Sequence, residues 1–373
     1  MPAAQEYTDE FRQRAVRMVL DVHPEAGGQL HAIERVADQL TVAPATLQQW
    51  VDQARTNETG EPSDARPPIE PDTYAEGLLL VQRGELGKAE TLWRTAAESG
   101  NTAAATGLGR LLVQRGDVAE AETWWRAAAD TGNIDAANYL GLLLVQRGDL
   151  HEAETRWRST AEAGDMAGAT MLGVLLMQRG AVAEAETWLR SAAEAGNNTA
   201  AFNLGLLLKR RGDLDGAARW SRVAAEAGDT DAANNLGLVL EEGGKLDEAV
   251  AWYRTAADTG HATAAYNLGL LLKQRGELDE AESWYRTAAE AGSASAANNL
   301  AVLLEHRGDL DDAATWYRAA AKAGNSNAAY NLGALLGRRG ELDEAVTWYR
   351  TAADAGHTAA AYNLNTLLGV KRS

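Results

Sequence analysis

The chain has 373 residues, no cysteine and a formal net charge of −18. Without cysteine it forms no disulfide bonds, and it holds no apolar stretch of the ~18 residues that a membrane-spanning helix needs. Because no apolar run of the secretory type stands near Met1 either, we expect a cytoplasmic protein with no membrane partner, and the excess of acidic groups disfavours nucleic-acid binding by the chain as a whole.

Residues 1–56 differ from the rest of the chain. Apolar side chains recur at helical spacing in three stretches, which lie at Phe11–Val19, Ile33–Leu40 and Leu47–Val51. Pro44 suits the first turn of the third helix, and only a short turn separates that helix from the second. The pattern predicts a small three-helix module of the helix-turn-helix type.

This segment resembles the N-terminal helix-turn-helix domain of transposases of the IS3 type. The matching runs are Phe11–Leu20, Val36–Leu40 and Ala45–Val51. The resemblance implies that the third helix enters the major groove of DNA. The DNA-binding candidates are then Thr46, Gln48 and Gln49, which would face base edges, and Arg55.

The charge of this segment leaves its role open. Residues 1–56 hold five arginines and eight acidic residues, so they carry few of the cations that neutralise DNA phosphates. Glutamine can still read adenine through two hydrogen bonds. The alternatives are a DNA reader and a module used for packing or dimerisation. Because repeats fill the rest of the chain, we do not expect a transposase.

Residues 57–71 form the predicted linker. They hold four of the seven prolines and show no apolar periodicity. Since a proline-rich segment is extended, we expect the two parts that it joins to move independently.

From residue 72 to residue 373 one unit of 32 residues recurs nine times. In each unit, apolar residues at helical spacing predict two helices; Leu268 and Leu272 mark the first, and Tyr285 and Ala288 mark the second. No strand pattern is present. Because one helix pair cannot bury its apolar faces alone, we predict an all-α stack of nine pairs. A constant glycine closes each unit, at Gly100, Gly132, Gly164, Gly196, Gly228, Gly260, Gly292, Gly324 and Gly356.

Turn residues predict where the helices begin. The first helix of a unit opens on a good N-cap residue such as Asn133, and we predict the same capping role for His261 and His357. The second helix follows an acid, and Asp149 with Glu152 three residues later predicts a capping box.

After the ninth unit a tenth first helix is predicted over residues 357–369. Asn365 and Thr366 stand there where the earlier copies have glycine and leucine. Such polar replacements predict a C-terminal capping helix, which a solenoid requires at its end.

The unit resembles two related repeat families. The Leu-Gly pair and the columns of Ala281, Tyr285 and Ala288 look like tetratricopeptide repeats, and the run Trp-Tyr-Arg-x-Ala-Ala-x-x-Gly-His with Tyr-Asn-Leu-Gly looks like Sel1-like repeats. The resemblance covers residues 72–373. It implies a right-handed superhelical solenoid whose first helices line a concave groove.

This resemblance also implies a binding site in the groove. Asparagine at this place would hydrogen-bond the backbone or terminal carboxylate of a bound peptide, since an amide both donates and accepts. The alternative is a ladder of asparagines that ties neighbouring first helices together. The predicted partner-binding residues are Asn203, Asn235, Asn267, Asn299, Asn331, Phe202, Tyr266, Tyr330, Leu206, Leu238, Leu270, Lys209 and Lys273.

Two further columns have a structural explanation. One position of the repeat holds arginine in every unit, as at Arg286, and such a row of arginines could hold phosphates. Glu282 stands four residues earlier, however, and predicts an ion pair along the helix. The tryptophan column could stack bases, but we interpret it as core. It comprises Trp188, Trp220, Trp252, Trp284, Trp316 and Trp348.

Catalytic patterns are not found. The sequence has no metal-ligand spacing, no phosphate-binding loop and no nucleophile motif, so we expect no enzyme, no metal and no cofactor. The leading hypothesis is a scaffold that binds a protein or peptide in the groove. One alternative is a transcriptional regulator whose helix-turn-helix reads DNA while the solenoid senses a partner. A second is a solenoid that self-assembles.

Overall fold

The computed structural model describes residues 73–370 and eleven positions near the start of the chain. Those eleven are residues 15–16, 18–19, 36–37, 40, 46–47 and 50–51. The predicted linker 57–71 and the candidates Gln48, Gln49 and Arg55 lie outside the described residues. Two compact units are distinguished, residues 1–107 and residues 108–373.

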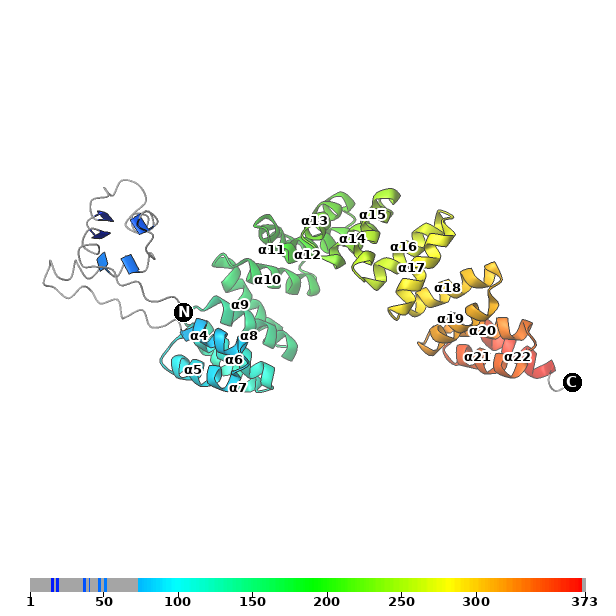
Figure 1. Cartoon of the computed structure of the whole chain (residues 1–373), viewed down its shortest axis with the longest axis horizontal. Helices are drawn as coiled ribbons and strands as arrows, with labels where there is room; N and C mark the ends of the chain where they lie inside the picture. Colours follow the sequence, from blue (N-terminus) through cyan, green and yellow to red (C-terminus); the bar gives the residue numbers. More distant parts are fainter. Residues whose placement is uncertain are drawn as a thin grey trace. The chain divides into compact units, whose positions relative to one another are not determined.

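Nineteen helices follow one another between residues 73 and 370 (Figure 1). They are α4 (Thr73–Gln82), α5 (Leu86–Glu98), α6 (Thr102–Arg115), α7 (Val118–Asp130), α8 (Ile134–Arg147), α9 (Leu150–Glu162), α10 (Met166–Gln178), α11 (Val182–Glu194), α12 (Asn198–Arg210), α13 (Leu214–Glu226), α14 (Thr230–Glu242), α15 (Leu246–Asp258), α16 (Ala262–Gln274), α17 (Leu278–Glu290), α18 (Ala294–Arg307), α19 (Leu310–Lys322), α20 (Ser326–Arg338), α21 (Leu342–Asp354) and α22 (Thr358–Val370).

The helices form nine pairs, and α22 follows the ninth. We term the even-numbered helices A helices and the odd-numbered ones B helices, so that repeat 1 is α4 with α5 and repeat 9 is α20 with α21. From α7 to α22 each helix packs against the next, and α12 also packs against the A helices on either side of it, α10 and α14. The predicted all-α solenoid of helix pairs is confirmed. Among the described residues there is no strand, and no helix is long and apolar enough to cross a membrane.

Near the start of the chain, the described positions are helical and share one buried cluster. Ala15, Val19, Val36, Leu47 and Val51 are each at most 4 % exposed and come from the three stretches predicted to be helices. The cluster fits a small packed core. How this module is used stays a prediction.

The A helices begin as predicted. The side chain of Asn133 accepts a hydrogen bond from the backbone N–H of Ala136 at 2.8 Å, and His261 does the same for Ala264 through Nδ1 at 3.0 Å. His357 accepts from Ala360 in the same way at 3.3 Å. These side chains satisfy N–H groups that the first helical turn leaves without a partner.

The B helices begin differently, and the predicted capping box is wrong. Asp149 makes no capping hydrogen bond, and its carboxylate instead accepts from the side chain of Arg147. Its ψ of 56° is far from the 113° of the capping residue Asn133, so the carboxylate is turned away from the helix. Among the aspartates at this position, Asp213, with a ψ of 79°, does accept from the N–H of Gly216.

In eight of the nine helix pairs, a glycine of the A helix lies against a side chain of the B helix sixteen residues later, and this side chain is in most cases a ring. A Cβ atom added to Gly141 in α8 would lie 2.4 Å from the ring of Trp157 in α9. Such a distance is far inside van der Waals contact, so glycine at position 141 lets these two helices approach this closely. The same glycine-to-side-chain contact recurs at Gly77–Trp93, Gly109–Trp125, Gly173–Leu189, Gly237–Tyr253, Gly269–Tyr285 and Gly333–Tyr349.

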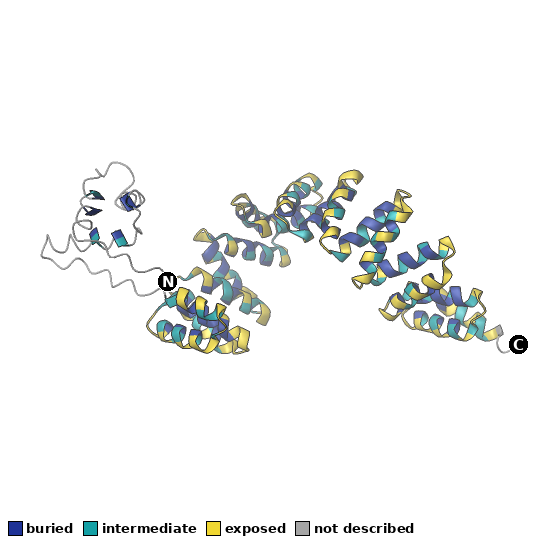
Figure 2. Ribbon diagram, viewed as in Figure 1, coloured by how far each residue is buried: buried dark blue, intermediate teal, exposed yellow. Residues whose placement is uncertain are grey.

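This contact corrects the prediction for the tryptophan column. The buried core position is one residue further along the B helix, where Tyr285 is fully buried while Trp284 is half-buried. Buried and exposed residues occur together on the helices throughout the array (Figure 2). An α-helix turns by about 100° per residue, so a shift of one residue moves a side chain from the core to its edge. Trp220 is the exception at 5 % exposed, because its core neighbour is the small Ser221.

The last helix ends the array with polar groups. Asn365 and Thr366 in α22 are exposed, as a capping helix requires. Since Asn365 occupies the position of the contact glycine, its side chain blocks the close approach that another B helix would need.

We predict that Gly141→Ala destabilises the array by about 1–3 kcal/mol, because the new methyl group collides with Trp157. Gly337→Ala in α20 is the matched control. Nothing lies within 4 Å of its added Cβ, so it should stabilise the helix by up to about 1 kcal/mol. Denaturant midpoints measured by circular dichroism check both; equal shifts would contradict the contact.

We also predict that stability falls above pH ~10. Burial raises the pKa of Tyr285 to about 12 and raises those of Tyr253 and Tyr317 as well. Because the folded-state pKa exceeds the unfolded one, the stabilisation is complete below pH ~10 and is lost as the pH rises through about 12. Tyrosinate absorbance and circular dichroism should change together in an alkaline titration. Tyr285→Phe should shift that transition to higher pH.

Candidate functional site

The predicted groove residues lie along one side of the A helices, which we term the A face. It comprises Phe202, Asn203, Leu206 and Lys209 of α12, Asn234, Asn235 and Leu238 of α14, Tyr266, Asn267, Leu270 and Lys273 of α16, Asn298 and Asn299 of α18, and Tyr330 and Asn331 of α20. All of them are half-buried except Asn235, which is buried, and Lys273, which is exposed. The surface therefore offers partly accessible apolar and amide groups over repeats 5 to 9.

The asparagines of this column have different local partners. Asn203 donates from Nδ2 to the backbone oxygen of Thr199 in its own helix at 2.8 Å. Asn235 is only 5 % exposed and donates to the Oγ atom of the fully buried Ser221 at 2.8 Å. Asn235 thus joins the A helix of repeat 6 to the B helix of repeat 5, which is a structural contact.

Two asparagines connect neighbouring A helices. Asn267 of α16 donates to Oδ1 of Asn234 in α14 at 3.0 Å, and Asn331 of α20 donates to Oδ1 of Asn298 in α18 at 3.2 Å. Asn298 in turn donates to Asn299 at 3.3 Å. These bonds form part of the ladder considered as an alternative. Because an amide has two N–H donors and an oxygen with two lone pairs, each side chain keeps capacity for a further bond.

Two aromatic residues of the A face, Tyr266 and Tyr330, pack against buried tyrosine rings of the B helices. The centroids of Tyr266 and Tyr285 lie 6.1 Å apart, and those of Tyr330 and Tyr349 lie 5.8 Å apart. Tyr330 also stacks on His357 at 4.5 Å. The aromatic side chains are therefore held in place by packing before any partner binds.

Sequence reasoning missed a second set of A-face residues. Asn234 and Asn298 alternate with Phe202, Tyr266 and Tyr330, so the pattern repeats every two units. This doubled period of 64 residues is the signal that could have found them.

Over repeats 5 to 8, one charged position of the A helices also changes sign from each repeat to the next, which gives the same period of 64 residues. Lys209 and Lys273 alternate with Glu241 and Glu305 at one position of the A helices. Glu241 accepts a hydrogen bond from the hydroxyl of the buried Tyr253 at 2.7 Å, and Glu305 accepts one from Tyr317 at 2.7 Å. The two acids thus tie A helices to B helices.

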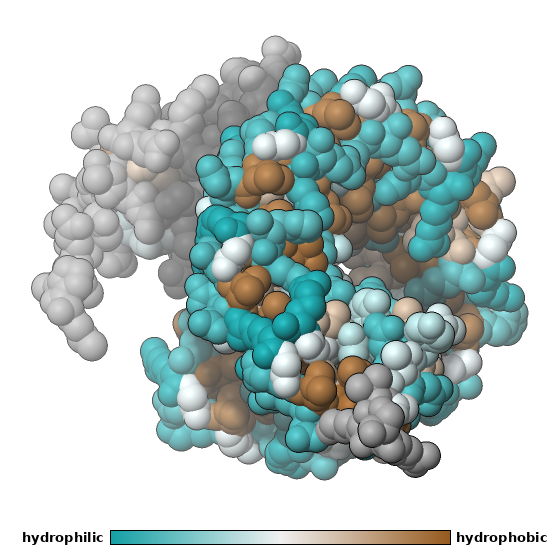
Figure 3. All heavy atoms as spheres, turned by 90° about the vertical axis from the view of Figure 1, so that its right-hand side faces the viewer, coloured by the Kyte–Doolittle hydropathy of each residue, from teal (hydrophilic) through white to brown (hydrophobic). Residues whose placement is uncertain are grey.

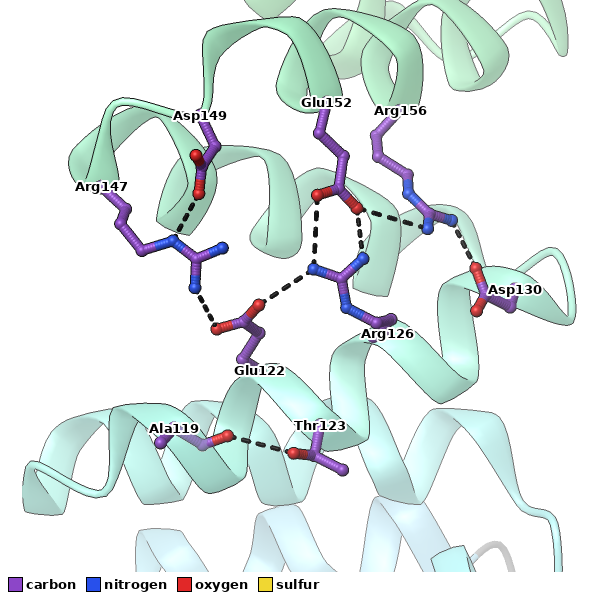
Figure 4. A network of polar contacts seen from close by, with 9 residues as sticks. All are labelled: Ala119, Glu122, Thr123, Arg126, Asp130, Arg147, Asp149, Glu152 and Arg156. Atoms are coloured by element: carbon purple, nitrogen blue, oxygen red, sulfur yellow. Dashed lines mark hydrogen bonds and ion pairs between the residues drawn. The ribbon is translucent and has the colours of Figure 1, made fainter.

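The arginine column is engaged in ion pairs, as its structural interpretation predicts. Arg286 pairs with Glu282 at 3.1 Å along α17, and Arg126 pairs with Glu122 at 2.9 Å along α7. Arg126 also pairs with Glu152 in the next B helix (Figure 4). The same link from one repeat to the next recurs for Arg158–Glu184, Arg222–Glu248, Arg254–Glu280 and Arg318–Glu344.

These ion pairs lower the pKa values of glutamates on the B helices. The hydrogen bond from Arg126 is the main cause that holds the pKa of Glu152 below its usual range, and Arg158 does the same for Glu184. Because both partners are partly exposed, each pair contributes little alone. Repeated along the array, they join successive B helices.

Among the described residues, no group of three or more His, Asp or Glu side chains could hold a metal ion. Hydrophobic and hydrophilic side chains are interspersed over the surface seen in Figure 3. The A face itself carries amide, aromatic and aliphatic groups, which can recognise a partner by hydrogen bonds and apolar contacts.

Comparison with known proteins gives a consistent result. A tetratricopeptide repeat family model matches residues 74–137, 140–198, 202–260 and 287–328, which is more than half of the chain. Two further tetratricopeptide repeat models match residues 261–291 and 326–351. None of the curated proteins matches the sequence.

Two solved structures are similar over most of their length. One is c5321, a protective antigen of uropathogenic Escherichia coli strains that displays an SLR fold; it is 25% identical, with a TM-score of 0.63, over 95% of this chain and 82% of that one. The other is a Sel1 repeat protein from Oxalobacter formigenes, 25% identical with a TM-score of 0.58, over 82% of this chain and 97% of that one.

We predict different roles for Asn235 and Asn267. Asn235→Ala leaves the buried hydroxyl of Ser221 without its donor and should cost about 1–3 kcal/mol of stability. Asn267→Ala leaves the half-buried amide of Asn234 without this bond, but water can reach that amide. The loss of stability should therefore be below about 0.5 kcal/mol. Chemical denaturation of the two variants checks this; a larger loss for Asn267→Ala would contradict the assignment.

Proposed function

The chain belongs to the tetratricopeptide repeat family, and we propose that it is a non-enzymatic scaffold that binds an extended segment of a partner protein along the A face. Stacked helix pairs present a long continuous surface, which repeat proteins use for such binding. The partner would lie across several repeats, because each repeat offers only a few groups.

One observation carries this proposal. Over α12–α20, each A helix presents amide side chains beside an aromatic or aliphatic one, and nearly all are half-buried. An amide supplies both a donor and an acceptor, which matches the alternation of C=O and N–H groups in an extended backbone. The apolar neighbours, such as Leu206 and Leu270, would contact the side chains of the partner.

A second candidate function concerns the start of the chain. The buried cluster that joins Val19, Val36 and Leu47 supports a packed three-helix module there, and such a module could read DNA through the predicted third helix. In this case the A face would sense a partner and the module would carry the signal to DNA.

The two candidates are tested by affinity purification of the full-length chain from its native cell, with and without nuclease. The test variant carries Leu238→Arg and Leu270→Arg on the A face. The control carries Leu246→Arg and Leu278→Arg, which alter the same two repeats at the starts of B helices, where the leucines are 40% and 49% exposed. Arginine keeps its aliphatic stem over the apolar surface, so both variants should fold.

We predict that protein partners survive nuclease and that the A-face variant loses them while the control keeps them. Charges placed in the middle of an apolar contact cost several-fold or more in affinity. Partners retained by both variants would overturn the A-face assignment. DNA fragments that co-purify and vanish with nuclease would instead support the second candidate.

A further inference from the structure

One position of the B helices holds tryptophan in nearly every repeat. From repeat 2 to repeat 9, seven of eight repeats have it, and the exception is Arg156 in α9. The tryptophans are Trp124, Trp188, Trp220, Trp252, Trp284, Trp316 and Trp348.

In repeats that have the tryptophan, charged side chains lie around the indole ring. The indole N–H of Trp284 donates to Glu280 at 3.3 Å, and that of Trp348 donates to Glu344 at 3.1 Å. An arginine of the preceding repeat can cover the ring, as the guanidinium of Arg286 lies 6.0 Å from the ring centroid of Trp316. The indoles of Trp284 and Trp348 thus have an acidic acceptor, and a guanidinium group lies over the ring of Trp316.

Repeat 3 keeps these surroundings without the ring. Glu152 occupies the position of Glu280, and Arg126 of the preceding repeat occupies the position of Arg286. The side chain of Arg156 is drawn aside, because its guanidinium pairs with Asp130 at 2.6 Å and with Glu152 at 3.6 Å (Figure 4). The two carboxylates thus hold the guanidinium group of Arg156.

A pocket of about 490 Å³ opens at this place. Its wall includes Ala129 at the end of α7, Ile134 and Ala137 at the start of α8, and Glu152 and Arg156 of α9. Ile134 is 38% exposed, and no other repeat has an isoleucine at its position. The pocket thus combines an apolar wall with an acidic acceptor and the guanidinium group of Arg156.

We propose that this pocket binds the indole side chain of a tryptophan carried by a partner protein. The bound ring takes the place that the chain's own tryptophan has in the other repeats. Its N–H donates to Glu152, one face meets the guanidinium group of Arg156, and its edge packs on Ile134. The site lies on the B-helix side of repeat 3 and does not depend on the A face.

The test uses the full-length chain and two short peptides, Gly-Gly-Trp-Gly-Gly and Gly-Gly-Leu-Gly-Gly with blocked ends. Binding is measured by ligand-observed NMR. We expect saturable binding of the tryptophan peptide and none of the leucine peptide at the same concentration. Arg156→Trp fills the pocket with an internal ring, so it should weaken binding at least tenfold and raise the melting temperature.

A second pair of variants does not depend on filling the pocket. Ile134→Asn introduces the residue that repeat 5 has there as Asn198, so the fold is kept while the apolar wall is lost. Met166→Asn makes the equivalent change in repeat 4, where Trp188 is present. We expect weaker binding for Ile134→Asn and unchanged binding for Met166→Asn. Equal binding of both peptides, or full binding by Arg156→Trp, would overturn the proposal.

Discussion

The close contact between a glycine of the A helix and a side chain of the B helix sixteen residues later holds eight of the nine pairs together. In repeat 3 this is Gly141 against Trp157, and in repeat 7 it is Gly269 against Tyr285. Because a ring lies against a bare backbone, the two helices pack tightly without a large core. Repeat 8 has Ala301 opposite Tyr317 instead, and both residues are buried. The tyrosine ring therefore accommodates one methyl group at this contact.

Two kinds of link then join one repeat to the next, and they lie on different helices. B helices are joined by arginine–glutamate pairs such as Arg126–Glu152, while A helices are joined by asparagine pairs such as Asn267–Asn234. Outside the pocket of repeat 3, the ion pairs use both charged groups within the B helices, so they leave little for a ligand. The amides use one or two bonds each and keep further donors and acceptors. This difference is the physical reason for assigning partner binding to the A face.

Much of the fold follows from the sequence, because the helical period, the turn glycines and the N-cap residues all agree. Asn133 and His261 cap their helices as their positions predict. The errors concern single residues. Asp149 does not cap, since neighbouring Arg147 takes its carboxylate, and Trp284 lies at the edge of the core, since periodicity cannot distinguish adjacent aromatic residues. The burial of Asn235 depends on Ser221 in another repeat, which no local pattern reveals. The identity of a partner has no such pattern at all.

The most direct test of the central claim is site-specific photo-crosslinking of the full-length chain in its native cell. A photoreactive amino acid replaces Leu270 on the A face in one variant and Leu278 at the start of the next B helix in another. The two positions lie in the same repeat, and Leu278 is the control because it is 49% exposed. The account predicts a discrete crosslinked protein from position 270 and none from position 278. A crosslink from position 278 alone would contradict it.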